Sequence, residues 1–167
     1  MDKLKTINQL ANIAAAAKKA GKTIGLITGC FDILHLGHIN LFDFAKKKVD
    51  IVIVGVESDA TVKLNKGVNH PFFNQQTRMK ILASLEGVDY VFKIGGKVRF
   101  VPEIAEPFYG KITQKIKPTV LITGKEADKN WEIKKQRVEK QGIGFIGYYR
   151  RGNEFSSRLI KLLEENL

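Results

Sequence analysis

The sequence predicts an α/β fold: a parallel sheet of about five strands with helices on both faces, in a single domain over residues 1–167. Two stretches, TIGLIT at residues 23–28 and DIVIVGV at residues 50–56, are almost continuously apolar. Strands of that kind are buried on both faces, which is typical of parallel sheets. Amphipathic helix patterns separate the apolar stretches, and no Pro/Gly/Ser-rich linker or internal repeat interrupts the alternation. The pattern therefore favours one doubly covered sheet.

Each expected strand is followed by an expected helix, which makes the fold Rossmann-like. A further helix leads the chain and ends near Gly21, and the next one carries an apolar face with Leu41, Phe42 and Phe44. The expected strands cover residues 23–28, 50–56, 90–94, 120–123 and 144–149, and the expected helices cover residues 8–20, 36–48, 75–85, 104–116, 130–141 and 156–165.

The composition is globular and basic, with 44% hydrophobic and 27% charged residues. The 28 Lys and Arg residues outnumber the 17 Asp and Glu residues, and the net charge of +11 favours anionic partners such as nucleotides and phosphorylated metabolites. Nucleic acid is less favoured, because the sequence lacks an arginine-rich tail and an RNA-recognition pattern of exposed aromatics. One cysteine, Cys30, and no apolar run of roughly 18 residues favour a cytoplasmic protein without a membrane partner.

Ligands of such sheets bind beyond the carboxyl ends of the strands, and the segment after the first strand is the most unusual. It reads GCFDILHLGH over residues 29–38 and runs directly into a helix. His35 and His38 are three residues apart and share one face of a helical first turn. A helix N-terminus attracts phosphate, and Gly37 leaves room for a triphosphate to approach the backbone. A zinc site with Cys30 and Asp32 is the alternative, but the phosphate interpretation explains the same residues.

The stretch GCFDILHLGH resembles the signature of the cytidylyltransferase-like nucleotidyltransferases, and it is most similar to the adenylyltransferase domain of ADP-heptose synthases (heptose 1-phosphate adenylyltransferases). The resemblance covers most of the chain and extends to GVESDATVKLNKG at 55–67, QTRMKILASLEGVDYV at 76–91 and RGNEFSSRLI at 151–160. It implies transfer of a nucleoside monophosphate from ATP to a sugar phosphate, with release of pyrophosphate, Mg²⁺ on the triphosphate and a homodimeric enzyme.

The resemblance also assigns residues to roles. His35, His38 and Lys66 become the catalytic residues, with Lys66 in a loop between a strand and a helix, and Arg78 organises the site or contacts substrate. From the residues alone, Lys66 is equally a solvated loop lysine and Arg78 a surface salt-bridge partner. The resemblance assigns nucleotide binding to Gly29, Cys30, Phe31, Asp32, Gly37, Gly124, Arg151, Ser156 and Ser157. From the residues alone, Ser156 is equally explained as the cap of a helix.

Some positions depart from related families. Glu86 stands where glycerol-phosphate cytidylyltransferases carry an arginine, which disfavours glycerol 3-phosphate as the acceptor. The heptose-type enzymes have a lysine, two glycines and an acid where this chain has Thr123, Gly124, Lys125 and Glu126, a loop that helps to recognise the base and the acceptor. Trp131 would stack on a base or, more commonly for such an aromatic, pack beneath the loop.

The expected mechanism is an in-line displacement, in which a phosphate oxygen of the acceptor attacks the α-phosphorus and pyrophosphate leaves. The acceptor phosphate is already anionic, so no protein nucleophile is needed. One alternative keeps this chemistry with CTP and a polyol phosphate such as glycerol 3-phosphate. Another is a non-catalytic nucleotide or RNA binder, which only the charge of +11 supports.

Overall fold

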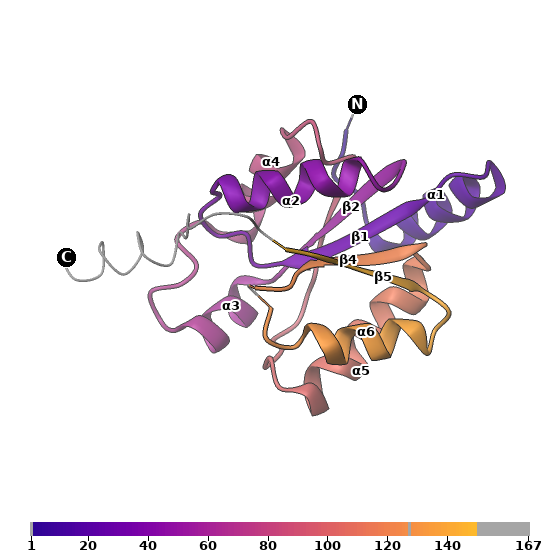
Figure 1. Ribbon diagram of the computed structural model, residues 1–167. Coiled ribbons are helices and arrows are strands. Elements are labelled where there is room, and N and C mark those ends of the chain that lie inside the picture. The colour runs from indigo at the N-terminus through magenta and orange to yellow at the C-terminus, as the bar shows by residue number, and fades with distance from the viewer. Residues whose placement is uncertain (1, 127, 150–167) are drawn as a thin grey trace.

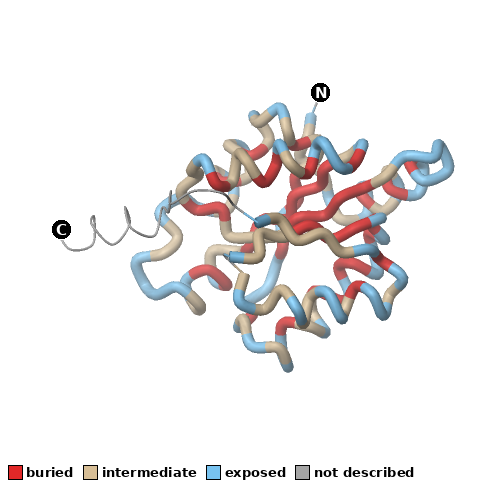
Figure 2. The backbone as a smooth tube through the Cα atoms, in the orientation of Figure 1, coloured by how far each residue is buried: buried red, intermediate tan, exposed pale blue. Residues whose placement is uncertain are grey.

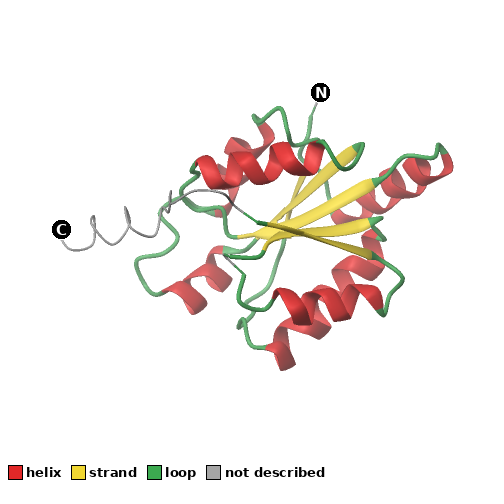
Figure 3. Ribbon diagram, in the orientation of Figure 1, coloured by secondary structure: helices red, strands yellow, loops and turns green. Residues whose placement is uncertain are grey.

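The computed structural model describes residues 2–126 and 128–149 of the chain, and its centre is a parallel sheet of five strands in the order β3-β2-β1-β4-β5 (Figures 1 and 3). Every neighbouring pair in the sheet is parallel. The predicted class, a Rossmann-like fold with helices on both sides, is confirmed. The strands are β1 (Ile24–Gly29), β2 (Ile51–Val56), β3 (Tyr90–Lys93), β4 (Val120–Gly124) and β5 (Gly144–Tyr148).

Two apolar clusters hold the helices against opposite faces of the sheet. Leu26 of β1 belongs to the cluster that the first, fifth and sixth helices share, while its neighbour Ile27 belongs to the cluster under the second and fourth helices. Successive strand residues point to opposite faces, so each strand serves both clusters. Figure 2 shows the buried strands between half-buried and exposed helices. The helices are α1 (Ile7–Lys19), α2 (Leu36–Lys46), α3 (Asp59–Lys66), α4 (Gln75–Ala83), α5 (Pro102–Ile116) and α6 (Trp131–Glu139).

Helix α3 corrects the prediction that placed Lys66 in a loop. Ser58 caps its N-terminus, because the Ser58 side chain accepts a hydrogen bond from the Thr61 N–H. Thr61 is buried, and Gly67 ends the helix with a φ of 107°, a conformation that glycine adopts without strain. With only eight residues, the helix is too short for a clear apolar period. The helix predicted for residues 156–165 lies outside the described residues.

The order of the strands sets where a ligand binds. The chain moves from β1 to β2 and β3 on one side of the sheet and then returns to β4 and β5 on the other. In sheets of this kind the ligand site is expected between the carboxyl ends of β1 and β4, where the strand order reverses, and the predicted histidine turn follows β1. None of the helices in the described part of the chain is long and apolar enough to span a membrane.

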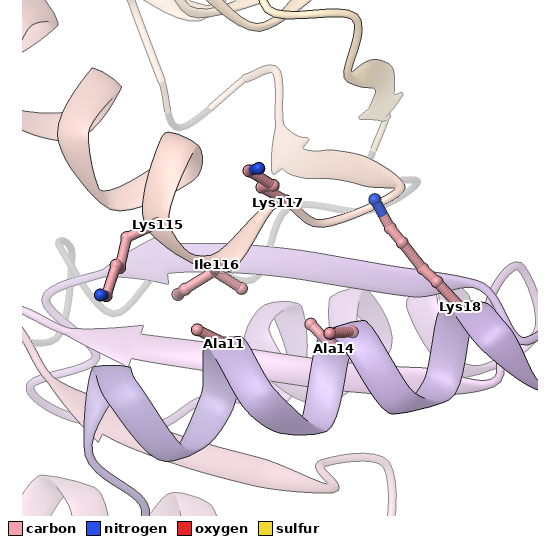
Figure 4. Close-up of a pocket in the computed structure, with 7 residues that line it drawn as sticks. Ala11, Ala14, Lys18, Lys115, Ile116 and Lys117 are labelled. Atoms are coloured by element: carbon pink, nitrogen blue, oxygen red, sulfur yellow. The ribbon is translucent and has the colours of Figure 1, made fainter.

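Two surface hollows formed by described residues lie away from the carboxyl edge of the sheet. One, of about 220 Å³, is formed by α1 and the end of α5, with lysines Lys18, Lys115 and Lys117 around an alanine floor (Figure 4). α1 ends shortly before β1 starts and α5 shortly before β4, so this hollow is near the amino ends of the strands. The carboxyl edge, rather than this hollow, carries the predicted site residues.

Candidate nucleotide-binding site

The turn after β1 reverses at Phe31, whose φ of 47° is in the left-handed region. Gly29, the last residue of β1, does not adopt a positive φ. Gly29 instead provides space, because a Cβ there would lie 2.8 Å from the Phe31 ring. The Phe31 ring is buried against Phe42 of α2 and meets the His38 ring edge-on, with centroids 5.4 Å apart. Phe31 thus fixes the start of α2 and one of the two predicted catalytic histidines.

The two histidine rings lie together at the N-terminus of α2. His35 is the N-cap residue, and its Nδ1 accepts a hydrogen bond of 3.1 Å from the Gly37 N–H. The rings of His35 and His38 are tilted by 37°, with centroids 3.9 Å apart. Because Nδ1 of His35 accepts, the proton of its neutral ring is on Nε2, which is then a hydrogen-bond donor. A donor imidazole beside a helix N-terminus is suited to a phosphate group.

Asp32 joins the histidine turn to the loop at residues 70–73. Its carboxylate is buried and accepts hydrogen bonds from the backbone N–H groups of Phe72 (3.0 Å) and Phe73 (3.1 Å). The Nδ1 atom of His70 lies 3.2 Å from the same carboxylate. Backbone N–H donors stabilise a buried carboxylate and fix its orientation. Asp32 thereby positions a loop that adjoins the turn.

Arg78 of α4 connects three segments at the carboxyl edge of the sheet. Its guanidinium donates to the backbone carbonyl oxygens of Cys30, Glu57 (2.7 Å) and Phe73 (2.9 Å). It also pairs with Asp59 at 2.7 Å, although its own side chain has no exposed surface. A surface salt bridge therefore does not describe Arg78. Its planar fork of donors holds the ends of β1 and β2 against the 70–73 loop.

Lys66 is the last residue of α3, and its side chain is exposed. Burial raises the pKa of the Cys30 thiol, and the positive charge of Lys66 is the largest influence that opposes this rise. The charge of Lys66 therefore acts on Cys30, a residue of the segment that leads into the histidine turn. The exposed side chain of Lys66 is accessible from solvent.

Glu57 and Tyr109 form a buried pair that was not predicted. Glu57 directly follows β2, and its Oε1 accepts a hydrogen bond of 2.9 Å from the Tyr109 hydroxyl of α5. Its other oxygen, Oε2, has no hydrogen-bond partner among the described residues. Burial raises the pKa of Glu57 to about 7, against the lowering effect of the Tyr109 hydrogen bond. Its position just after a buried strand was the only sequence signal for this role.

In the loop after β4, the two residues that depart from the heptose-type pattern, Thr123 and Lys125, make contacts within the protein. The Thr123 hydroxyl donates to Asp128 at 3.0 Å, and Lys134 pairs with the same carboxylate at 2.5 Å. The Lys125 ammonium lies 3.6 Å from the centroid of the Trp131 ring, which also stacks on Phe145. Trp131 thus packs beneath the loop, the more common of its two expected roles.

Of the remaining predicted residues, Gly124 ends β4, and a Cβ at this position would meet nothing within 4 Å. Arg151, Ser156 and Ser157 lie outside the described residues. Within residues 2–126 and 128–149, no group of three or more His, Cys, Asp and Glu side chains is arranged to hold a metal ion. The described site therefore consists of the histidine turn, Lys66 and the bracket formed by Asp32 and Arg78.

The histidine turn at the carboxyl edge of the parallel sheet lies where the sequence predicted the site of a nucleotidyltransferase. The sequence model of the Cytidylyltransferase-like family matches residues 26–164, and the chain belongs to this family. Among curated relatives, the Bifunctional protein HldE of Aliarcobacter butzleri is 39% identical over 72% of this chain and 23% of its own length. The protein of the same name from Geobacter metallireducens is 34% identical over 84% of this chain and 26% of its own. The chain spans about a quarter of the length of these relatives.

Solved structures agree with the fold. The lipopolysaccharide core biosynthesis protein from Thermoplasma volcanium superposes with a TM-score of 0.63 at 25% identity, over 80% of this chain and all of its own. Pantoate-beta-alanine ligase from Francisella tularensis gives a TM-score of 0.69 at 24% identity, over all of this chain and 74% of its own, which shows a likeness of fold. The family membership and the curated relatives identify the chain as a nucleotidyltransferase enzyme.

Proposed function

We propose that this enzyme transfers adenylate from ATP to a sugar phosphate similar to heptose 1-phosphate and releases pyrophosphate. The observation that carries the proposal is the pair of adjacent imidazoles, His35 and His38, whose ring centroids lie 3.9 Å apart at the N-terminus of α2. The positive end of the helix dipole and the imidazole donors lie together at this N-terminus, and both attract the phosphate groups of a triphosphate. The exposed Lys66 adds a cation on the neighbouring segment.

The transfer is a single in-line displacement. A phosphate oxygen of the acceptor forms a bond to the α-phosphorus, and the bond from that phosphorus to the bridging oxygen breaks, so that pyrophosphate leaves with the electron pair. His35 and His38 donate hydrogen bonds to the α-phosphate oxygens, where charge develops, and Lys66 offsets charge on the leaving group. Arg151, Ser156 and Ser157 complete the proposal as ligands of the outer phosphates.

Magnesium is proposed as the counterion of the triphosphate rather than as an ion held by a protein cage. Asp32 is the carboxylate nearest in sequence to the histidines, and both of its oxygens already accept hydrogen bonds from the 70–73 loop. The ion would therefore take its ligands mainly from phosphate oxygens and water, as Mg²⁺ does in many nucleotide sites. It would neutralise charge on the leaving pyrophosphate.

Three considerations support a sugar phosphate and ATP. The resemblance to heptose 1-phosphate adenylyltransferases extends over most of the chain, and curated relatives carry the name HldE. A solved relative at 25% identity is described as a lipopolysaccharide core biosynthesis protein. Glu86 replaces the arginine expected of an enzyme for glycerol 3-phosphate. A cytoplasmic location and a homodimer are part of the same proposal.

The test is a screen for pyrophosphate release with ATP, CTP, GTP and UTP against sugar 1-phosphates and polyol phosphates. We expect the highest kcat/KM with ATP and a sugar 1-phosphate. His38→Ala should lower that kcat by a factor of about a hundred to a thousand, because a donor to the developing charge is lost. A screen without pyrophosphate release, or a His38→Ala variant with the wild-type rate, would refute the proposed role.

A further inference from the structure

Exposed apolar side chains stand at the start of α2 and on the loop that Asp32 joins to the histidine turn. Four of the seven large apolar residues that are most exposed in the described part of the chain are Leu36, Val68, Phe72 and Phe73, which we call the apolar rim. Leu36 directly follows His35, and the other three belong to the loop between α3 and α4. Scattered exposed apolar residues are ordinary, but a concentration of them at one site marks a surface that binds something.

The loop that carries Phe72 and Phe73 is fixed in place although their side chains are exposed. Both backbone N–H groups donate to the buried Asp32 carboxylate, three residues before His35, and the Phe73 carbonyl accepts from Arg78. The Phe72 ring meets the His70 ring edge-on, with centroids 5.7 Å apart, and His70 in turn contacts Asp32. Both phenylalanines, each 44% exposed, are therefore held on a rigid backbone next to the phosphate turn.

An aromatic face recognises a particular kind of acceptor. The ring carbons of a cyclic sugar present a flat patch of C–H groups, which are slightly positive and are attracted to the negative face of an aromatic ring. An acyclic polyol phosphate has no such flat patch. Phenyl rings also have no polar group to desolvate, so they discriminate by shape and contact area rather than by hydrogen bonds.

We propose that Phe72 and Phe73 form a stacking subsite for the ring of a cyclic sugar phosphate and select it over acyclic polyol phosphates. The subsite rests on the proposed function and extends it, because it states which class of acceptor the turn receives and which side chains choose it. With the acceptor ring stacked on the rim, its phosphate lies toward the histidine turn that Asp32 joins to the same loop.

Binding is measured first, without the reaction. Wild-type enzyme is titrated calorimetrically with glucose 1-phosphate, mannose 1-phosphate and glycerol 3-phosphate, and saturation-transfer NMR records which sugar protons contact the protein. We expect the cyclic compounds to bind more tightly and to show contact at ring C–H protons. Phe72→Leu and Phe73→Leu keep apolar area but remove the flat ring, and each should weaken cyclic-sugar binding by about tenfold. Phe72→Tyr keeps the flat ring and should bind the cyclic sugars as tightly as the wild type does. Ile104→Ala, which removes a comparably exposed side chain from α5 on the opposite face of the sheet, is the control.

Each possible result supports or overturns the stacking subsite. Equal affinity for glycerol 3-phosphate and the sugars, no binding of either sugar, or leucine variants with wild-type affinity would overturn the subsite. Leucine variants that change only the sedimentation of a dimer would assign the rim to a contact between copies. If the sugars bind through Phe72 and Phe73 but no nucleoside triphosphate yields pyrophosphate, the subsite stands and the proposed reaction fails.

Discussion

Arg78 shows at the scale of one residue how a buried charge organises a site. Its fork of donors reaches main-chain oxygens on three segments, so no neutral side chain of similar size replaces it. We expect Arg78→Lys to lower the free energy of unfolding by about 3 kcal/mol, since one ammonium cannot reach the same three carbonyls and the buried groups lose their partners. Urea denaturation measures the loss. Arg99→Lys, the same change at an exposed position, should be neutral, and an equal effect at both positions would refute the bracket.

Glu57 makes stability depend on pH. The pKa of its carboxyl is about 7 in the folded protein, above its ordinary value of 4.5. Between these values the folded protein keeps a proton that the unfolded chain releases, so stability falls as the pH rises and the loss is complete above 7. The full effect is about 3 kcal/mol. Glu57→Gln should remove this dependence, as urea midpoints from pH 4.5 to 8 would show.

Tyr109→Phe is the companion variant. It removes the hydrogen bond that lowers the pKa of Glu57, so the fall in stability should extend to higher pH than in the wild type. An identical pH profile in the wild type, Glu57→Gln and Tyr109→Phe would show that this carboxyl does not titrate in the folded protein.

At the scale of the element, His35 caps the N-terminus of α2 and also takes part in the proposed reaction. Its Nδ1 accepts from the Gly37 N–H, and in the proposed reaction its other nitrogen donates to phosphate. Asparagine is also a good N-cap residue, so His35→Asn should keep the unfolding free energy within about 0.5 kcal/mol of the wild type. The same variant should lose at least about a hundredfold in kcat, because the imidazole donor is gone. Stability and pyrophosphate release are measured on one preparation, and an asparagine variant with full activity would assign His35 a capping role alone.

Elements with a strong period were predictable, and those set by local contacts were less so. The strands follow from almost continuous apolar runs, and the helix after the histidine turn follows from a pattern of period 3.6. Helix α3 was missed because Ser58 and the buried Thr61, rather than an apolar stripe, determine it. The turn at Phe31 was missed because its conformation depends on ring packing against Phe42, which sequence spacing does not reveal.

The same division applies to the candidate site. Residues whose proposed role lies in their chemistry, such as His35, His38 and Lys66, could be named from the sequence because histidine, lysine and glycine are unusual after a buried strand. Residues whose role depends on three-dimensional contacts could be predicted only in part. The sequence indicated that Arg78 is a site residue but not that its side chain is buried. Nothing in the sequence indicated that the Glu57 side chain contacts Tyr109 of α5.

For the whole molecule, the fold places Lys66, the proposed phosphate ligand, and Lys115 at opposite edges of the sheet. Lys66 belongs to the carboxyl edge, while Lys115 lines the hollow near the amino ends of the strands (Figure 4). Lys66→Met should raise the KM for the nucleoside triphosphate by about tenfold or more, because a charge-assisted contact is lost. Lys115→Met removes the same charge and should leave KM within about twofold, since water and salt screen charges far apart on the surface. Equal effects would mean that Lys66 acts only through net charge.

The bracket around Arg78 also bears on how this enzyme can change. Arg78 binds main-chain oxygens at Cys30, Glu57 and Phe73, and every amino acid carries such an oxygen. Asp32 likewise binds main-chain N–H groups, which only proline lacks. The frame of the site is therefore indifferent to which side chains stand at positions 72 and 73. Random libraries at these two positions should yield folded enzymes with altered acceptors, so the loop is a place where evolution, or a protein engineer, can exchange substrates without rebuilding the phosphate site.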